Sequence, residues 1–333
     1  MDKVLQSIYP SMTAAADFLS NTKRLVQAIV LWKECLTFLN NKHLEKENDL
    51  ARKVSMMLYD RLCHGYAAIY KLSPAIESGK KLLVLLRKCK RKKEECDTAG
   101  MLTILYYQKG EYKEAQQYLQ KALTIKTEIG DKHGQATCYI NQRNVFHSVG
   151  EYAKAEEYLQ KALPINTEIG DKHGQASCYI NLGNVFLSVG EYAKAGEYLQ
   201  KALPINTEIG DKDGQASCYI NLGTVFLSVG EYAKAEEYLQ KALPINTEIG
   251  DKHGQATCYM NLPNVFRSVG EYAKAEEYFQ KALPINTEIG DKHRQASCYT
   301  NLGSVFLSVG EYAKAKEYLQ KALPINTKIG KMA

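Results

Sequence analysis

Residues 176–215 read ASCYINLGNVFLSVGEYAKAGEYLQKALPINTEIGDKDGQ, and close copies of this 40-residue unit fill most of the chain. Its segment Gly-Glu-Tyr-Ala-Lys-Ala begins at Gly190 and returns every 40 residues, with a looser version that begins at Gly110. Self-similarity at a fixed period of this length is the signature of a repeat architecture. By this phase six repeats cover 96–333, and the last of them is two residues short. Their bounds are 96–135, 136–175, 176–215, 216–255, 256–295 and 296–333.

Each repeat contains two helical patterns separated by a glycine. In the first, apolar residues and one glycine share a helical face at Tyr179, Leu182, Gly183 and Phe186. In the second, the shared face holds Tyr192, Ala195, Leu199 and Ala202. Gly190 should end the first helix, because glycine adopts a left-handed C-terminal turn at little cost. Gly210 should end the second helix in the same way, and Asp211 should cap the first helix of the next repeat.

The two-helix repeat predicts the fold class. One helix pair cannot bury its apolar face alone, so neighbouring repeats must stack on each other. Small residues such as Ala195 and Ala202 let the helices approach closely, while the aromatic residues fill the space between layers. The sequence shows no alternation of the β type. We therefore expect an all-α fold, a right-handed superhelical α-solenoid of stacked antiparallel helix pairs.

The repeat resembles the tetratricopeptide repeat, whose positions for Trp, Leu-Gly, Tyr, Ala, Phe and Ala can be matched one by one. Those positions hold Tyr179, Leu182-Gly183, Phe186, Ala195, Leu199 and Ala202. The repeat departs from the family in its length, 40 residues in place of about 34. Units of this kind, which end in Ile-Gly-Asp-Lys and carry Asn-Leu-Gly, are similar to those of tetratricopeptide repeat protein 28-like and LGN/Pins-type proteins. The resemblance is specific for fold and weakly specific for function.

The N-terminal third keeps the 40-residue phase faintly, because Tyr59, Leu62 and Tyr66 stand 40 residues before Ala99, Leu102 and Tyr106. We therefore expect 56–95 to be a degenerate repeat. Residues 1–55 should form an N-terminal helical cap, whose outer face need not accept another repeat. The chain stops at Ala333 directly after a predicted second helix. An exposed apolar end is thus expected, which implies self-association through this helix, a missing segment or a fraying last helix.

Composition bounds the class of protein. The chain is 45% hydrophobic and 24% charged, which excludes a disordered chain. Its longest aliphatic run, Leu82–Leu86, is far shorter than the roughly 20 residues that span a bilayer. No signal-peptide pattern follows Met1. We therefore expect a cytoplasmic protein with no membrane partner.

The net charge of +6 is spread unevenly, because Lys80–Lys93 holds eight basic residues and no acid. Phosphate contacts from this stretch would give salt-dependent nucleic-acid binding. Its tail, Arg87–Lys93, is similar to a nuclear-import signal, a motif with many false matches. The leucines within the stretch also fit an amphipathic helix with basic flanks. Nucleic-acid binding or a nuclear role is therefore the alternative function.

Residues in patterns that carry chemistry are missing from the sequence. It has no Gly-rich phosphate loop, no His-Glu-x-x-His and no Gly-x-Ser-x-Gly. The nine cysteines are not clustered as metal ligands would be, and we interpret them as small buried apolar residues. Histidines recur in the turn after Asp, a surface position, at His133, His173, His253 and His293. We therefore expect no enzymatic activity, no cofactor and no metal.

An uncharged polar stripe runs along the first predicted helix, opposite its apolar face. In residues 176–215 it consists of Ser177, Asn181, Asn184 and Ser188. The first helices of such solenoids line the inner, concave surface, so the stripe would build a ladder of amides there. The candidate peptide-binding residues are Asn141, Asn144, Asn181, Asn184, Asn221, Asn261, Asn264 and Asn301.

Asparagine suits recognition of an extended chain. Its side-chain amide donates two hydrogen bonds and accepts two, so it can hold the N–H and the C=O of a peptide backbone. The resemblance implies the same use for the Asn of Asn-Leu-Gly at Asn181, Asn221 and Asn301, and with altered following residues at Asn261 and Asn141. We therefore expect a non-catalytic scaffold or adaptor for protein partners. The competing interpretation is that these amides cap or bridge neighbouring helices and bind nothing.

Two better-defined subclasses fit poorly. An LGN-like regulator would carry C-terminal GoLoco motifs, and a kinesin-light-chain-like adaptor would carry an N-terminal heptad coiled coil. The sequence shows neither pattern. The group to which it is most similar is therefore the protein 28-like one.

The repeat pattern is broken at several positions. A proline inside the second helix, such as Pro204, should kink it and cost about 3 kcal/mol if unrelieved. Pro263 replaces the close-packing glycine of a first helix, and Gln142 with Arg143 replaces a Leu-Gly pair. We interpret these changes as drift in recently copied repeats and not as functional hinges.

Overall fold

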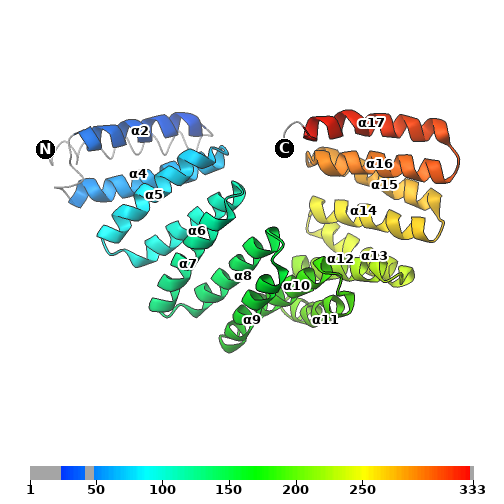
Figure 1. Cartoon of the computed structure of the whole chain (residues 1–333), viewed down its shortest axis with the longest axis horizontal. Coiled ribbons are helices and arrows are strands. Elements are labelled where there is room, and N and C mark those ends of the chain that lie inside the picture. The colour runs from blue at the N-terminus through cyan, green and yellow to red at the C-terminus, as the bar shows by residue number, and fades with distance from the viewer. Residues whose placement is uncertain (1–23, 42–48, 331–333) are drawn as a thin grey trace. The chain divides into compact units, whose positions relative to one another are not determined.

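The computed structural model describes residues 24–41 and 49–330, and every regular element in these ranges is an α-helix (Figure 1). The all-α prediction is therefore confirmed for the described part of the chain. Residues 1–23 and 42–48 of the expected cap, and 331–333 of the last repeat, lie outside it. The chain divides into two compact parts, Met1–Ile165 and Asn166–Ala333. The finer division into a cap, a degenerate repeat and six repeats stays a prediction.

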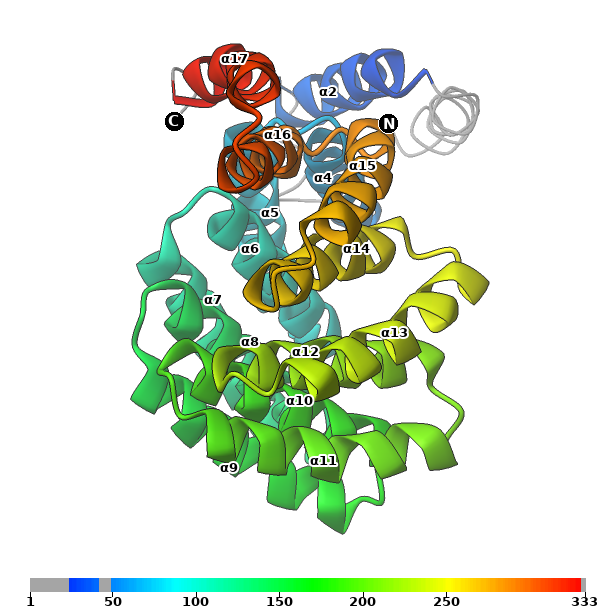
Figure 2. The same cartoon turned by 90° about the vertical axis from the view of Figure 1, so that its right-hand side faces the viewer.

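The helices alternate between the two roles expected from the repeat. Helix α2 (Leu25–Asn41) precedes the pairs. First helices of the pairs are α4 (Asp49–Ala68), α6 (Lys92–Gln108), α8 (Lys132–Ser148), α10 (Lys172–Ser188), α12 (Lys212–Ser228), α14 (Lys252–Ser268) and α16 (Lys292–Ser308). Second helices are α5 (Leu72–Lys88), α7 (Tyr112–Glu128), α9 (Tyr152–Glu168), α11 (Tyr192–Glu208), α13 (Tyr232–Glu248), α15 (Tyr272–Glu288) and α17 (Tyr312–Gly330). Figure 2 shows α12 and α13 side by side as one such pair.

The helix ends follow from the predicted turn residues. Gly190 adopts a left-handed φ of 78° after α10, and the N–H of Glu191 then donates to the carbonyl of Phe186 at 2.9 Å. Asp171 caps α10, because its carboxylate accepts a hydrogen bond from the N–H of Gly174 at 2.8 Å. Such bonds satisfy backbone groups that a helix terminus leaves open.

The left-handed turns extend into the N-terminal part at residues other than glycine. Tyr70 has a φ of 55° and Lys90 a φ of 57°. They stand 40 residues before Gly110 and Gly130, which have the same turn geometry. A side chain at such a position is strained, because the left-handed region brings Cβ close to the backbone.

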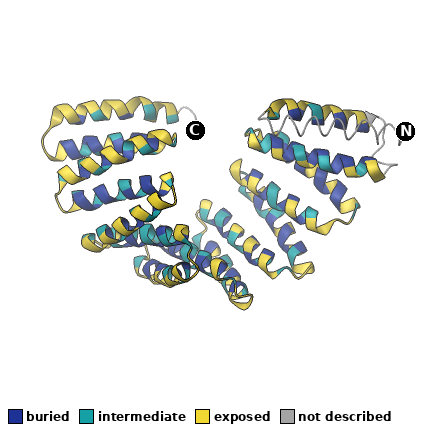
Figure 3. Ribbon diagram, turned by 180° about the vertical axis from the view of Figure 1, so that it is seen from behind, coloured by how far each residue is buried: buried dark blue, intermediate teal, exposed yellow. Residues whose placement is uncertain are grey.

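Close packing within a pair depends on small residues, as expected. A Cβ added to Gly183 would lie 2.8 Å from Cγ of Leu199 on the second helix. The rings of Phe186 and Tyr198 stack beside this contact, with centroids 5.4 Å apart. Along each helix buried and exposed faces alternate (Figure 3). The core therefore runs between the helices of each pair and between neighbouring pairs.

The prolines of the second helices lie on the exposed side. Helix α11 continues through Pro204 to Glu208. Pro204 is exposed, and so is Gln200, whose carbonyl would have accepted the missing bond. Water can reach that carbonyl, which lowers the cost of the proline. Pro263 differs because it is buried in α14.

The pair that replaces Leu-Gly in α8 is buried. Gln142 donates to Oε1 of Gln120 at 3.3 Å, but its own Oε1 is buried without a hydrogen-bond partner. Arg143 donates to Oδ1 of Asn144 at 2.8 Å. Burial lowers the pKa of the Arg143 guanidinium to about 10. Two polar side chains thus occupy core positions, which is costly for the fold.

Candidate functional site

The stripe asparagines lie on the first helices at partly open positions. Asn141 is exposed, and the other seven are half-buried. In the C-terminal part, α10 contacts α12 and α12 contacts α14 directly. The stripe positions of these three helices therefore belong to one continuous layer. A half-buried amide with a fixed backbone is a suitable position for a hydrogen bond to a ligand.

Several of these amides already have partners within the chain. Nδ2 of Asn221 donates to Oδ1 of Asn184 at 2.8 Å and so joins two neighbouring first helices. Nδ2 of Asn181 donates to Oγ of Ser177 at 3.4 Å, and Nδ2 of Asn264 to the carbonyl of Met260 at 3.2 Å. An amide has more bonds to give than one. The stripe residues thus bridge layers to some extent, as the competing interpretation expects.

A second row of asparagines escaped the sequence reasoning. Asn206 is 1% exposed, and its Nδ2 donates to Sγ of Cys218 in the next repeat at 3.6 Å. Its backbone carbonyl accepts a hydrogen bond from Nε2 of Gln215 at 3.2 Å. The recurring Pro-Ile-Asn segment was the available signal. The buried row consists of Asn166, Asn206, Asn246 and Asn286.

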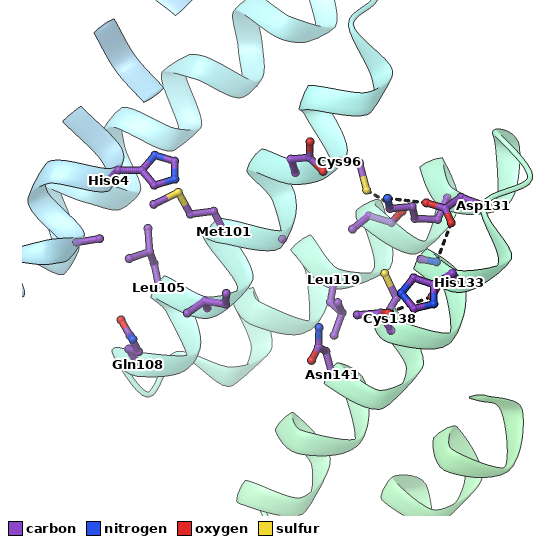
Figure 4. Close-up of a pocket in the computed structure, with 18 of the residues that line it drawn as sticks. His64, Cys96, Met101, Leu105, Gln108, Leu119, Asp131, His133, Cys138 and Asn141 are labelled. Carbon is purple, nitrogen blue, oxygen red and sulfur yellow. Dashed lines mark hydrogen bonds and ion pairs between the residues drawn. The ribbon is translucent and has the colours of Figure 1, made fainter. Parts of the chain in front are cut away.

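The N-terminal part contains a pocket of about 750 Å³ between its first helices (Figure 4). Its floor comes from buried apolar residues, among them Leu105 of α6 and Leu119 of α7. Its walls contain all four stripe positions of α6, which are Asp97, Met101, Ile104 and Gln108. The stripe positions Thr137 and Asn141 of α8 and His64 of α4 also line it. The stripe therefore lines a real hollow in this part of the chain.

A narrower pocket of about 470 Å³ continues this hollow between α4 and α6. It shares His64, Asp97 and Met101 with the larger pocket and adds Met56 and Met57. Methionine is flexible and polarizable, so it adapts to apolar ligands of different shape. The two pockets together are called the α4–α8 groove below.

Charges in the groove are partly compensated. Nζ of Lys126 lies 2.8 Å from Oδ2 of Asp131. This hydrogen bond raises the pKa of Lys126 and lowers the pKa of Asp131, so both stay charged. Burial raises the pKa of the Cys138 thiol to about 11. That thiol is neutral at ordinary pH and a poor nucleophile.

The basic stretch Lys80–Lys93 is engaged in part with its own chain. Arg87 pairs with Glu95 at 2.6 Å, and Lys81 pairs with Glu77 at 2.8 Å. Nζ of Lys80 lies 5.3 Å from the ring centroid of Tyr106. The leucines of the stretch that point inward are buried at Leu82, Leu83, Leu85 and Leu86. These contacts fit the basic flanks of an amphipathic helix.

Stacked helix pairs with a lined hollow define the class of α-solenoid repeat proteins. The model of the tetratricopeptide repeat family matches the chain at residues 96–168, 144–208, 174–248, 215–288 and 254–328. The chain therefore belongs to the tetratricopeptide repeat family, as its sequence predicted. A search of curated proteins gave no match.

Solved structures share the fold at low sequence identity. The apo form of RapI is 20% identical, with a TM-score of 0.66, over 83% of this chain and 99% of RapI. The apo quorum sensor NprR from B. thuringiensis is 13% identical, with a TM-score of 0.67, over 95% and 86% of the two chains. A Rap protein complexed with competence and sporulation factor is 16% identical, with a TM-score of 0.55, over 97% and 99%. These likenesses concern the fold. In the described residues, none of the helices is both long and apolar enough to cross a membrane.

Proposed function

We propose that the chain is a non-catalytic scaffold or adaptor that binds extended segments of protein partners along the stripe of its first helices. The observation that carries the proposal is the α4–α8 groove, because its walls are built from stripe positions of three successive first helices. Hollows of several hundred Å³ with a few convergent polar groups are the usual form of ligand sites.

The amides of the stripe supply backbone recognition without demanding a particular side chain. Asn141 is exposed at the edge of the groove, and Asn181 and Asn301 are half-buried at the equivalent positions of later repeats. Each keeps the capacity for more than one hydrogen bond. Membership of the tetratricopeptide repeat family agrees with a role in protein interaction. One structural neighbour, a Rap protein, is complexed with competence and sporulation factor.

The test compares the two rows of asparagines in the full chain. Asn181, Asn221 and Asn301 are replaced together by Ala, and captured proteins are identified by mass spectrometry beside a thermal melt. The matched control replaces Asn206 and Asn246 of the buried row. Lost capture with unchanged melting of the stripe variant supports the proposal. A lowered melting temperature with capture retained in the folded fraction would show that the stripe serves only the fold.

Self-association through α17 is a second part of the proposal. Leu323 is 65% exposed, whereas its equivalent Leu283 on α15 is half-buried. Asn326 is exposed, whereas its equivalent Asn286 is fully buried. The face that earlier second helices bury against the next repeat is thus open on α17. Sedimentation of the full chain and of a Leu323→Glu variant tests this, since association through α17 should weaken in the variant.

A further inference from the structure

We infer that the α4–α8 groove binds an extended segment that carries one large aliphatic side chain close to a basic one. The inference rests on the proposed function and names the chemistry of its partner. Two features of α6 single this groove out: its stripe has apolar residues where the later repeats have amides, and its wall has a gap where they have a side chain.

The amide ladder ends where α6 begins. Met101 and Ile104 stand at the positions that hold Asn181 and Asn184 two repeats later. Ile104 is 58% exposed although it is a large aliphatic residue. Exposed aliphatic side chains gathered in a hollow gain free energy when an apolar partner covers them. The groove thus offers an apolar contact that the later stripe does not.

Gly100 explains why a pocket opens beside this helix. The equivalent position holds Ile140, Ile180 and Ile220 in the next repeats, and all three are half-buried. A Cβ added to Gly100 would have no atom within 4 Å. The space that an isoleucine side chain occupies elsewhere is therefore open here. An aliphatic side chain of a partner can fill it, above the apolar floor of Leu105 and Leu119.

The charge of the pocket selects the neighbouring residue. Two carboxylates, Asp97 and Asp131, line it together with one lysine, Lys126. Lys126 donates its hydrogen bond to Asp131. With both lining histidines, His64 and His133, neutral, the wall has one net negative charge, which is carried by the exposed Asp97. A lysine or arginine of the partner would compensate it.

The test uses the full chain and a phage-displayed library of random twelve-residue peptides. Selected sequences should be enriched in Leu, Met or Ile within a few residues of Lys or Arg. The affinity of a selected, fluorescein-labelled peptide is then measured by polarisation. Replacing its aliphatic residue by Ser should weaken binding by about tenfold or more.

Two protein variants separate the groove from the rest of the stripe. Gly100→Ile fills the gap with the residue of the other repeats and should raise helix propensity, so binding falls by about tenfold or more in a folded protein. Asp97→Asn should weaken binding by about threefold to tenfold, and more at low salt. Ile129→Ser, in an exposed turn, is the matched control and should change nothing.

The outcomes distinguish this inference from the proposed function. Binding that survives Gly100→Ile but is lost in the Asn181, Asn221 and Asn301 variant overturns the inference and leaves the proposed function standing. Binding that survives both, or selected peptides with no shared aliphatic residue and no response to either variant, overturns both.

Discussion

The side-chain amide of Asn206 donates a hydrogen bond to the thiol of Cys218, with 3.6 Å between Nδ2 and Sγ, and both side chains are buried. The bond joins the second helix of one repeat to the first helix of the next. The same contact recurs between Asn166 and Cys178 at 3.5 Å. A polar atom in this core is thus satisfied by a residue that reads as apolar in the sequence. Regular stacking of the repeats depends on these pairs.

Removal of one such amide should loosen the boundary between two repeats. We expect Asn206→Ala to lower the free energy of unfolding by about 1–3 kcal/mol, because the bond is lost and a cavity remains in a packed layer. Hydrogen exchange should rise in α11 and α12, and the urea midpoint should fall. Asn181→Ala, on the open stripe, is the control and should leave both unchanged. Equal effects of the two substitutions would contradict the distinction between the two rows.

Relief of the strained turns should stabilise the N-terminal part. Tyr70 and Lys90 adopt the left-handed conformation that Gly110 and Gly130 adopt one repeat later. Tyr70→Gly and Lys90→Gly should each raise the free energy of unfolding by about 1 kcal/mol. Thermal melting of each variant is the measurement. A drop in melting temperature would mean that the side chains contribute more than the strain costs.

Restoration of the Leu-Gly pair in α8 should also stabilise the chain. Gln142→Leu with Arg143→Gly removes two polar side chains from the core and recreates the close packing seen at Gly183. We expect a gain of about 1–3 kcal/mol, since buried charge is costly without full compensation. Urea unfolding would report the gain as a higher midpoint. An unchanged or lower midpoint would show that the two side chains are better accommodated than their burial indicates.

The buried thiols should make stability depend on alkaline pH. Burial raises the pKa of Cys178 to about 11 and of Cys218 to about 12, from an ordinary value of 9.0. Above pH 9 the unfolded chain loses these protons while the folded chain keeps them. The unfolded state is therefore favoured as pH rises, by about 1.4 kcal/mol per thiol at pH 10, and the effect levels off near pH 11–12.

A variant with Cys178 and Cys218 replaced by Ala should lose less stability between pH 8 and pH 10 than the parent chain, although it starts from a lower value. Urea midpoints at the two pH values measure the difference. Parallel pH profiles of parent and variant would mean that other groups cause the alkaline loss.

The repeat period alone was sufficient to predict the helix pairs, their caps and the burial of the cysteines. Gly190, Asp171 and Cys178 act locally or at a fixed place in a helix, so their roles follow from spacing. The cost of the prolines was harder to predict, because it depends on whether the carbonyl at Gln200 meets water. That is a property of the stacked layers.

The pocket shows the same limit of sequence reasoning. A comparison of the repeats position by position shows that Gly100 and Met101 depart from Ile180 and Asn181. It cannot show that a hollow results, because neighbouring helices could have closed the gap. The buried amide row was missed for a related reason. Asn206 is a polar residue in a mostly exposed helix, and only its contact with the next repeat reveals its role.

The location of a bound peptide is the most direct test of the binding stripe. A selected peptide that carries a photoreactive diazirine is irradiated with the full chain, and the cross-linked residues are identified by mass spectrometry. We predict cross-links on the stripe positions of α6 and α8, such as Ile104 and Asn141. Cross-links confined to the second helices α7 and α9 would contradict it.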